Sequence, residues 1–353
     1  MKRVSIFLGW ILILPFLVIT WTLNAEPIST SPSKAQNCPE YKVVNRISVE
    51  GDGFWDLATV DETTGKLYLS HGSIVQVVDT KSGKLAGYIP DTNVVHGIAI
   101  ANDFNKGFIT CGKDSKVVIF DLKSLKILAK IPSGKGPDGI LYDPFSRKVF
   151  AFNGKSADVT VIDAKKNTVV VTLKLGGKPE LPVSDDNGTI FVNIQDKNMI
   201  ETINVKTLKV EQKWPIIPGE EPTGLAIDKA NHRLFIGCNN KLMVIMDSLN
   251  GKFISSVPVG AYVDGAGFDP GTRCAFTSNG DGTLTVVQEE SKDKFRVLEN
   301  VVTQKGARTL AVDTKTHHIF LPTAVFGPPP QRPNLRPFVQ HGTFVVLDVA
   351  PGE

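Results

Sequence analysis

The sequence predicts an all-β fold, a seven-bladed β-propeller, and three observations support this prediction. A unit of about forty residues recurs seven times in the 353-residue chain, at spacings of 42, 41, 42, 43, 41 and 44 residues. Every copy contains short runs rich in β-branched and aromatic residues, without a helical period. The spacing is typical of four-stranded propeller blades rather than helical solenoids. The copies begin at Phe54, His96, Pro137, Pro179, Pro222, Val263 and Ala307.

Each copy is predicted to contain four strands. An innermost apolar strand opens the copy, and a second strand such as KVFAFNG follows an Asp/Gly-containing turn. A third strand, such as IVQVVDT, ends in Asp or Asn, whose side chain can bond the backbone of the next turn, as in DTKSGK. A fourth strand such as KLAGYIP then runs outward. These runs fit strands buried in a blade.

The seventh copy differs because it stops at its third strand, near Ala350. An additional strand-like segment, Tyr41 to Glu50 (YKVVNRISVE), precedes the first copy and matches the pattern of a fourth strand. We expect this N-terminal strand to complete the last blade and close the ring, which leaves no unpaired edge across the seam. The propeller is therefore predicted to span residues 41–350.

The N-terminus predicts export. Lys2 and Arg3 precede an apolar stretch from Val4 to Thr20, and a small residue at Ala25 offers a cleavage point, so residues 1–25 resemble a signal peptide. The apolar segment is also long enough to act as an uncleaved membrane anchor, which would be the protein's only membrane contact. Residues 26–40 read as a linker. The predicted location is periplasmic or secreted, with membrane anchoring if the signal is not cleaved.

The repeat units are similar to those of a known family. Blocks such as VTVIDAKKNTVVVTLKLGGKP and EPTGLAIDKANHRLFIGCNN resemble the YVTN repeats of YncE-like seven-bladed propellers, over residues 41–350, although the literal tetrapeptide is absent. The resemblance implies an exported scaffold that binds a ligand or a macromolecule. Some YncE-like proteins have been proposed to bind DNA. Here the net charge of +3 gives no electrostatic nucleic-acid footprint, so nucleic acid is not indicated.

No disulfide is predicted within the chain: three cysteines are expected to be small buried residues, and Cys38 to be free or available to a partner. Cys111 and Cys238 occupy equivalent positions in blades two and five, Cys274 begins the second strand of blade six, and Cys38 falls in the linker. Bridged Cα atoms must lie within about 7 Å, and the repeat map brings no pair that close. There is also no haem-attachment motif, so covalent haem is not expected.

A ring of polar residues appears when the starts of the innermost strands are aligned across the blades. Seven different residues at one position argue against simple repeat symmetry, and a convergent acid, base and cation in a concave site fit a binding pocket. A hydrated funnel whose side chains cap loop amides is the alternative. The residues of this polar ring are Asp56, His96, Asp138, Glu180, Thr223, Asp264 and Arg308.

Histidines on neighbouring blades raise the possibility of a metal site. His71 and His341 occupy equivalent places in blades one and seven, and His96 starts blade two. With Asp56 they offer imidazole and carboxylate ligands for a divalent or transition metal ion. The alternative is that each His-Gly pair simply forms a turn. No other cofactor is assigned.

Blade seven contains an insertion between Phe320 and Gly342 with six prolines. Proline restricts the chain, so the loop can form a semi-rigid cover over the funnel, in which Arg332 and Arg336 meet an anionic ligand. A polyproline-like surface for a protein partner and a plain surface insertion are alternatives. At the same mouth, Trp55 either stacks on a ligand or seals blade one against blade seven.

Binding is favoured over catalysis. The chain lacks a GxSxG elbow, a P-loop and a GxGxxG motif after a strand. The predicted function is an exported propeller that engages a small ligand or a protein partner at the funnel. The alternative is a metal-dependent lyase or hydrolase, with His96 as base and Glu180 or Asp138 as acid or ligand.

Overall fold

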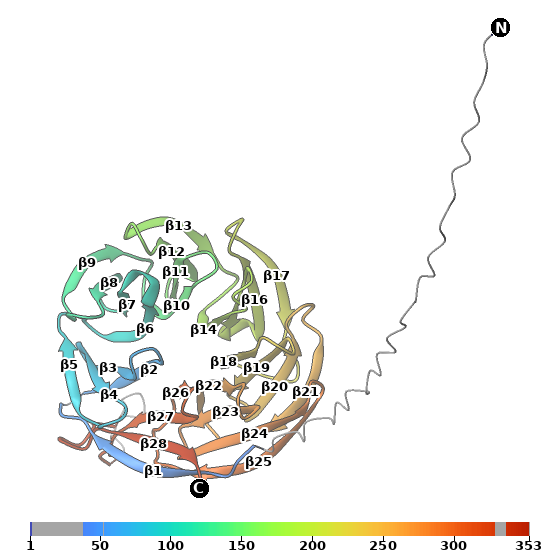
Figure 1. Cartoon of the computed structure of the whole chain (residues 1–353). Helices are drawn as coiled ribbons and strands as arrows, with labels where there is room; N and C mark the ends of the chain where they lie inside the picture. Colours follow the sequence, from blue (N-terminus) through green and yellow to red (C-terminus); the bar gives the residue numbers. More distant parts are fainter. Residues whose placement is uncertain (2–37, 52, 329–336, 353) are drawn as a thin grey trace. The chain divides into compact units, whose positions relative to one another are not determined.

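The computed structural model describes Met1 and residues 38–51, 53–328 and 337–352, so the predicted signal peptide and most of the predicted linker lie outside it. From Cys38 onward, seven four-stranded antiparallel sheets are arranged as a seven-bladed β-propeller (Figure 1). Helix in this part of the chain is limited to two 3-10 turns, η1 (Asn102–Phe104) and η2 (Gln195–Lys197). The all-β, seven-bladed prediction is confirmed.

In blades one to six, four consecutive strands form each sheet, and the first strands contact one another around the ring. Blades one to three comprise β2 (Trp55–Asp61), β3 (Lys66–His71), β4 (Ile74–Asp79) and β5 (Leu85–Ile89); β6 (Val95–Ala101), β7 (Lys106–Cys111), β8 (Lys116–Asp121) and β9 (Ile127–Pro132); and β10 (Pro137–Asp143), β11 (Lys148–Asn153), β12 (Asp158–Asp163) and β13 (Thr168–Lys174). Blades four to six comprise β14 (Pro179–Ser184), β15 (Thr189–Ile194), β16 (Met199–Asn204) and β17 (Lys209–Pro215); β18 (Pro222–Asp228), β19 (Arg233–Cys238), β20 (Leu242–Asp247) and β21 (Phe253–Pro258); and β22 (Val263–Asp269), β23 (Cys274–Asn279), β24 (Thr283–Ser291) and β25 (Lys294–Val302).

Blade seven is closed by the N-terminal strand. Its sheet runs from β26 (Ala311–Asp313) through β27 (His318–Thr323) and β28 (Val345–Pro351) to β1 (Tyr41–Ser48), which pairs antiparallel with β28. The predicted ring closure is confirmed. The innermost strand is shorter than predicted, because Ala307 lies in a turn where its N–H donates to Gln304 O, and the strand begins only at Ala311.

The hydrophobic core is divided among the blade interfaces. Buried apolar residues form seven clusters, each joining two neighbouring blades. An aromatic ring occupies the third position of every second strand and is at most 1% exposed, which places a large apolar group inside every sheet. These residues are Tyr68, Phe108, Phe150, Phe191, Phe235, Phe276 and Phe320.

A disulfide contradicts the prediction that no cysteines pair. Cys38 is bonded to Cys274, with a Cα–Cα distance of 5.9 Å. The repeat map placed Cys38 in the linker, but β1 begins beside blade six, only three residues after Cys38. There the Tyr41 N–H donates to Glu299 Oε1 at 2.7 Å, and the Tyr41 ring packs edge-on against Phe276. The bridge therefore fastens the closing strand to the neighbouring blade.

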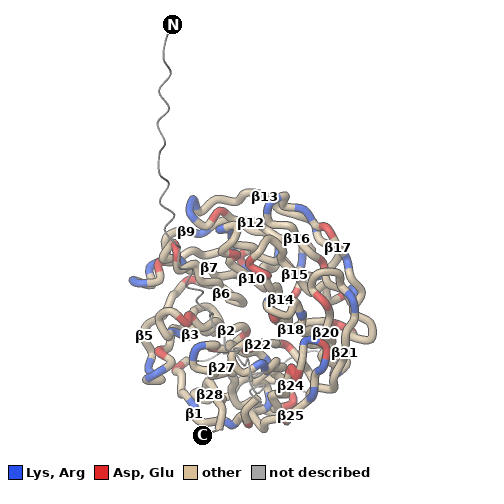
Figure 2. Tube along the Cα trace, turned by 45° about the vertical axis from the view of Figure 1, so that its right-hand side comes forward, with Lys and Arg blue, Asp and Glu red and all other residues tan. Residues whose placement is uncertain are grey.

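Charges of both signs are distributed around the ring (Figure 2), in keeping with 39 basic and 36 acidic residues in the chain. Among the described residues, no helix is long and apolar enough to cross a bilayer. The predicted anchor segment, Val4 to Leu23, lies outside those residues.

Candidate functional site

The polar ring coincides with β-bulges. In each of blades one to six, the pairing of the innermost strand with the second strand shifts register near its start, for example between Val95 and Ile98 in blade two. A bulge breaks the regular alternation of side chains and re-aims the residue it contains. The polar-ring residues within these six irregularities are Asp56, His96, Asp138, Glu180, Thr223 and Asp264.

Backbone groups near the bulges are held by hydroxyl and amide side chains of adjacent blades. These hydrogen bonds measure 2.6–2.9 Å and satisfy carbonyls that the irregular pairing leaves available. They tie blade to blade on the inner side of the propeller and so fix the strands from which the polar ring projects. The bonds run from Thr309 to Asp56 O, Thr59 to Ile98 O, Thr110 to Asp138 O, Asn193 to Thr223 O, Thr223 to Val263 O, and Ser278 to Arg308 O.

Six of the seven residues of the polar ring line one pocket of about 620 Å³ at the end where the innermost strands begin, which we call the funnel. Thr223 does not line it. Its side chain is buried and its hydroxyl donates to Val263 O, so blade five contributes a blade-to-blade contact instead of a funnel group. The funnel residues from the ring are Asp56, His96, Asp138, Glu180, Asp264 and Arg308.

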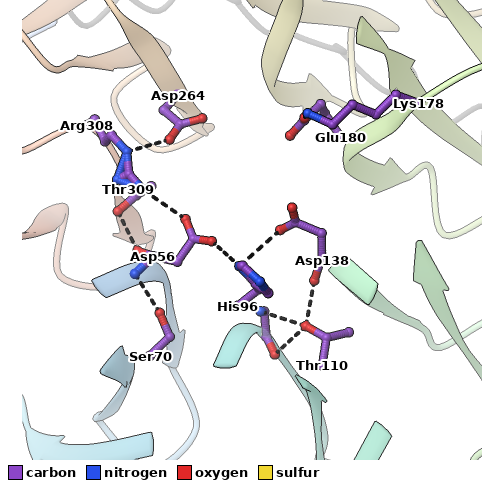
Figure 3. A network of polar contacts seen from close by, with 11 residues as sticks. Asp56, Ser70, His96, Thr110, Asp138, Lys178, Glu180, Asp264, Arg308 and Thr309 are labelled. Atoms are coloured by element: carbon purple, nitrogen blue, oxygen red, sulfur yellow. Dashed lines mark hydrogen bonds and ion pairs between the residues drawn. The ribbon is translucent and has the colours of Figure 1, made fainter. Parts of the chain in front are cut away.

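His96 and Arg308 link the acidic side chains (Figure 3). His96 Nδ1 lies 2.5 Å from Asp56 Oδ2 and 3.8 Å from Asp138 Oδ1. Arg308 Nε lies 2.9 Å from Asp264 Oδ2, and its Nη2 lies 3.3 Å from Asp56 Oδ1. Groups from blades six, seven, one, two and three therefore form one continuous polar network.

The funnel environment raises the pKa values of its carboxyl groups. Burial, followed by the negative charge of Asp56, raises the pKa of Asp138 to about 7, even though 31% of the Asp138 side chain faces the funnel. Burial likewise raises the pKa of Asp264 to about 6 and that of Glu180 above its ordinary value. For His96, burial lowers the pKa, but the hydrogen bond to Asp56 and the nearby carboxylates outweigh it and raise the pKa overall.

The three histidines predicted as metal ligands do not form one cluster. His71 is buried, its Nδ1 lies 2.7 Å from Gln76 Oε1, and its ring stacks on Phe344. His341 lies exposed in the blade-seven insertion. Among the residues that the structure describes, one set of three potential ligand atoms lies within 4.8 Å of one another, and of the three histidines only His96 belongs to it. Its members are Asp56, His96 and Asp138.

Trp55 fits the interpretation in which it seals blade one against blade seven. It is 4% exposed and packs against Phe326 and Phe344, with ring centroids 5.5 and 5.7 Å away. Trp55 and its neighbour Phe54 both line the funnel and an adjoining cavity of about 840 Å³, but Phe54 is 42% exposed. Phe54 is thus the more accessible aromatic surface at the mouth.

The base of the blade-seven insertion is ordered as a short antiparallel pair. Phe326 bridges Val339, and the Gly327 N–H donates to Phe338 O at 2.8 Å. Residues 329–336, which include Arg332 and Arg336, lie outside the described part of the chain. Their predicted role in ligand binding stays a prediction.

The polar ring predicted from the sequence omits one funnel residue, Lys178, and one residue that lies beside the His96 ring, Gly112. Lys178 lies 2.6 Å from Glu180 and lines the funnel. Its place directly before Pro179, two residues before the polar-ring residue Glu180, is the sequence signal that points to it. Gly112 lies so close to the His96 ring that an added Cβ would approach Nε2 to 2.5 Å. Only the tertiary structure shows that contact.

Comparison with known proteins shows the fold of the chain but does not assign it to a family. No protein-family model matches the chain, and no curated protein matches its sequence. Among solved structures, the chain is similar to Kuenenia stuttgartiensis hydrazine synthase (TM-score 0.67, 14% identity, covering 77% of this chain and 94% of that one). It is also similar to U3-55K (0.71, 10%, 87% and 99%) and to a chain of the mitotic checkpoint complex (0.69, 13%, 87% and 96%). At these identities the likeness establishes the propeller fold alone.

Proposed function

We propose that the protein is an exported, YncE-like binding protein that holds a small, positively charged ligand in the funnel. The propeller fold is commonly an interaction scaffold and does not by itself assign a reaction. The observation that carries the proposal is the convergence of charged side chains from six blades on a single pocket of about 620 Å³.

The charge balance of the funnel favours a cation. Four carboxylates line the pocket, against two permanent cations, Arg308 and Lys178, and one imidazole, His96. Above about pH 7, where the four carboxylates are ionised, the lining has a charge of −2 when the imidazole is neutral (4 acids minus 2 bases) and −1 when it is protonated. A ligand with positive charge compensates this excess, and the low-dielectric walls strengthen the attraction. The lining carboxylates are Asp56, Asp138, Glu180 and Asp264.

Export is supported by the disulfide. Bridges form and persist in oxidising compartments, and they are rare in the cytosol. The Cys38–Cys274 bond therefore agrees with the signal-like N-terminus and with the repeats that resemble those of YncE-like proteins. Fractionation of cells that produce the chain, with cysteine alkylation before lysis, tests this part of the proposal.

Calorimetric titration of the purified, chelator-treated chain with small cations tests the binding function. The probes are lysine, putrescine, choline, Zn²⁺ and Mn²⁺. We expect at least one probe to bind with a Kd below about 1 mM. At about pH 8, above the raised pKa of Asp138, binding should weaken in Asp138→Asn and Glu180→Gln, each of which removes negative charge from the funnel.

Glu211→Gln is the matched control, because Glu211 is an exposed carboxylate on the outer strand β17. It changes the same charge away from the funnel and should leave binding intact. The proposal is overturned if none of the probes binds, or if the two funnel variants bind as tightly as the unmodified chain.

A further inference from the structure

We propose that Asp56, His96 and Asp138 bind a divalent first-row transition-metal ion at the mouth of the channel. The inference rests on the proposed function, because it names the cation that the funnel holds. It differs from the His71–His96–His341 set expected from the sequence, since only His96 is retained and the other ligands are carboxylates.

The ligand atoms have the spacing that a metal ion requires. His96 Nδ1 and one oxygen from each carboxylate lie within 4.8 Å of one another, with individual separations from Nδ1 of 2.5 Å to Asp56 and 3.8 Å to Asp138. Metal–nitrogen and metal–oxygen bonds of about 2.0–2.2 Å place neighbouring ligand atoms about 3–3.5 Å apart. The observed separations bracket this range, so side-chain adjustments of less than about 1 Å bring the three groups to bonding distance.

The backbone beneath the two carboxylate ligands is fixed independently of their carboxyl groups. All three residues lie in the bulges of consecutive blades. The Asp56 N–H donates to Ser70 Oγ at 2.8 Å, and the Asp138 carbonyl accepts from Thr110 Oγ1 at 2.6 Å. Because neighbouring side chains satisfy these backbone groups, the carboxylates need not cap them. The ligands are therefore presented by rigid strands, as a precise site requires.

Asp138 has an incomplete set of partners. Among the described residues, no hydrogen bond reaches its carboxylate oxygens, and its single ion pair is the 3.8 Å contact with His96. Arg308 neutralises Asp264 and Lys178 neutralises Glu180, so neither cation serves Asp138. A metal ion placed between Asp138 and His96 supplies the missing positive partner.

Two outer contacts orient the remaining ligands. Arg308 holds the Oδ1 atom of Asp56, which turns Oδ2 toward His96. Gly112 leaves room for the His96 ring, since a Cβ there would approach Nε2 to 2.5 Å. Outer groups that aim metal ligands typically change affinity by about 10- to 100-fold when altered.

The donor set selects the class of metal. An imidazole nitrogen suits Zn, Cu, Fe and Ni, whereas carboxylate oxygens also suit Mn. Mg²⁺ and Ca²⁺ prefer sites made of oxygen alone. A site with one imidazole and two carboxylates therefore binds first-row transition metals in preference to Mg²⁺ or Ca²⁺.

Calorimetric titration of the untagged, chelator-treated full chain with Zn²⁺, Mn²⁺ and Mg²⁺ tests the site. We expect Zn²⁺ or Mn²⁺ to bind with a stoichiometry of about one and at least about 10-fold more tightly than Mg²⁺. His96→Ala should weaken binding by more than about 100-fold, because altering an outer contact alone costs up to that much. Gly112→Ala, which displaces the ring but keeps every ligand, should weaken it by about 10- to 100-fold.

His318→Ala is the matched control, because His318 also pairs with an aspartate, Asp348, but lies away from the funnel. It should bind metal as the unmodified chain does, and thermal unfolding of each variant verifies that it is folded. The site is overturned if the chain does not bind Zn²⁺ or Mn²⁺, or if folded His96→Ala retains full affinity. An organic amine that binds through Asp138 while no metal binds would remove this inference and leave the proposed function standing.

Discussion

The two faces of the propeller use the same residue types for different purposes. On the funnel face, His96 lies between two aspartates contributed by two other blades. On the opposite face, where the first and second strands of each blade are joined, His317 pairs with Asp269 and His318 with Asp348, each at 2.7 Å. An Asp–His pair by itself therefore does not distinguish a site from a structural contact.

For the His317–Asp269 pair, the difference from the funnel lies in what else the carboxylate of Asp269 binds. Asp269 also accepts hydrogen bonds from Gly271 N–H and Thr272 Oγ1 at the turn of its own blade, so its oxygens are fully engaged. On the funnel face, hydroxyl groups such as that of Ser70 satisfy the bulged backbone instead. The carboxylates of that face are consequently available to groups from other blades or to a ligand.

The largest expected effect on stability comes from the Cys38–Cys274 bridge, which fastens the closing strand β1 to blade six. Replacing Cys38 and Cys274 together with serine removes a bridge that spans 236 residues of sequence. Because long loops gain most from closure, we expect the free energy of unfolding to fall by about 3–5 kcal/mol. Urea unfolding of both proteins gives the difference. A thiol titration that finds four free cysteines in the denatured, unreduced chain would contradict the bridge.

The second prediction concerns the inner strands of the funnel side. A Cβ on Gly224 would lie 2.6 Å from the backbone of blade six, at Ala266 N. Gly224→Ala should therefore force blades five and six apart and destabilise the fold by about 3 kcal/mol. Gly154→Ala is the control, because its Cβ meets no atom closer than 3.7 Å and should change stability by at most about 1 kcal/mol. Equal effects of the two changes in urea unfolding would refute this explanation.

The third prediction concerns the pH dependence of stability that arises from a buried carboxyl group on the face opposite the funnel. On the side away from the funnel, burial and then the negative charge of Asp228 raise the pKa of Glu289 to about 7. The folded state then keeps a proton that the unfolded state loses near its ordinary pKa of 4.5. Stability contributed by this group should therefore fall by about 2–3 kcal/mol as pH rises from about 4.5 to 7.

Glu289→Gln should abolish that part of the pH dependence, which urea unfolding at a series of pH values measures. Its effect on the fold should be smallest at low pH, where both side chains are neutral. If the variant and the unmodified chain show parallel stability curves over this range, Glu289 is ionised in the folded state at neutral pH.

The smallest stability effect is expected for the histidines away from the funnel. His317→Ala removes one hydrogen bond from a carboxylate that keeps two others, so we expect a loss of about 1 kcal/mol. Its affinity for Zn²⁺ should remain that of the unmodified chain, whereas His96→Ala should lose it. A variant of His317 that loses metal binding would break the distinction between the faces.

The sequence alone determined the number of blades and the way in which the N-terminal strand closes the ring. The spacing of apolar runs gave seven blades, and the orphan strand at Tyr41 gave the partner of β28, because strand burial imposes a pattern that each copy repeats. It also located the polar ring, since one position per blade breaks that pattern.

The tertiary structure decided which polar groups meet. Thr223 occupies the position of the polar ring, but its hydroxyl donates to Val263 O. His71 contacts Gln76 and stacks on Phe344. Neither residue therefore joins the funnel groups. Cys38 reaches Cys274 because β1 begins beside blade six, where Tyr41 contacts Phe276. A comparison of the repeats does not show this, because Cys38 belongs to none of them. Periodicity specifies the position of a residue within its own blade. The direction of a side chain at a bulge, and its partner across a blade interface, depend on atoms contributed by another copy.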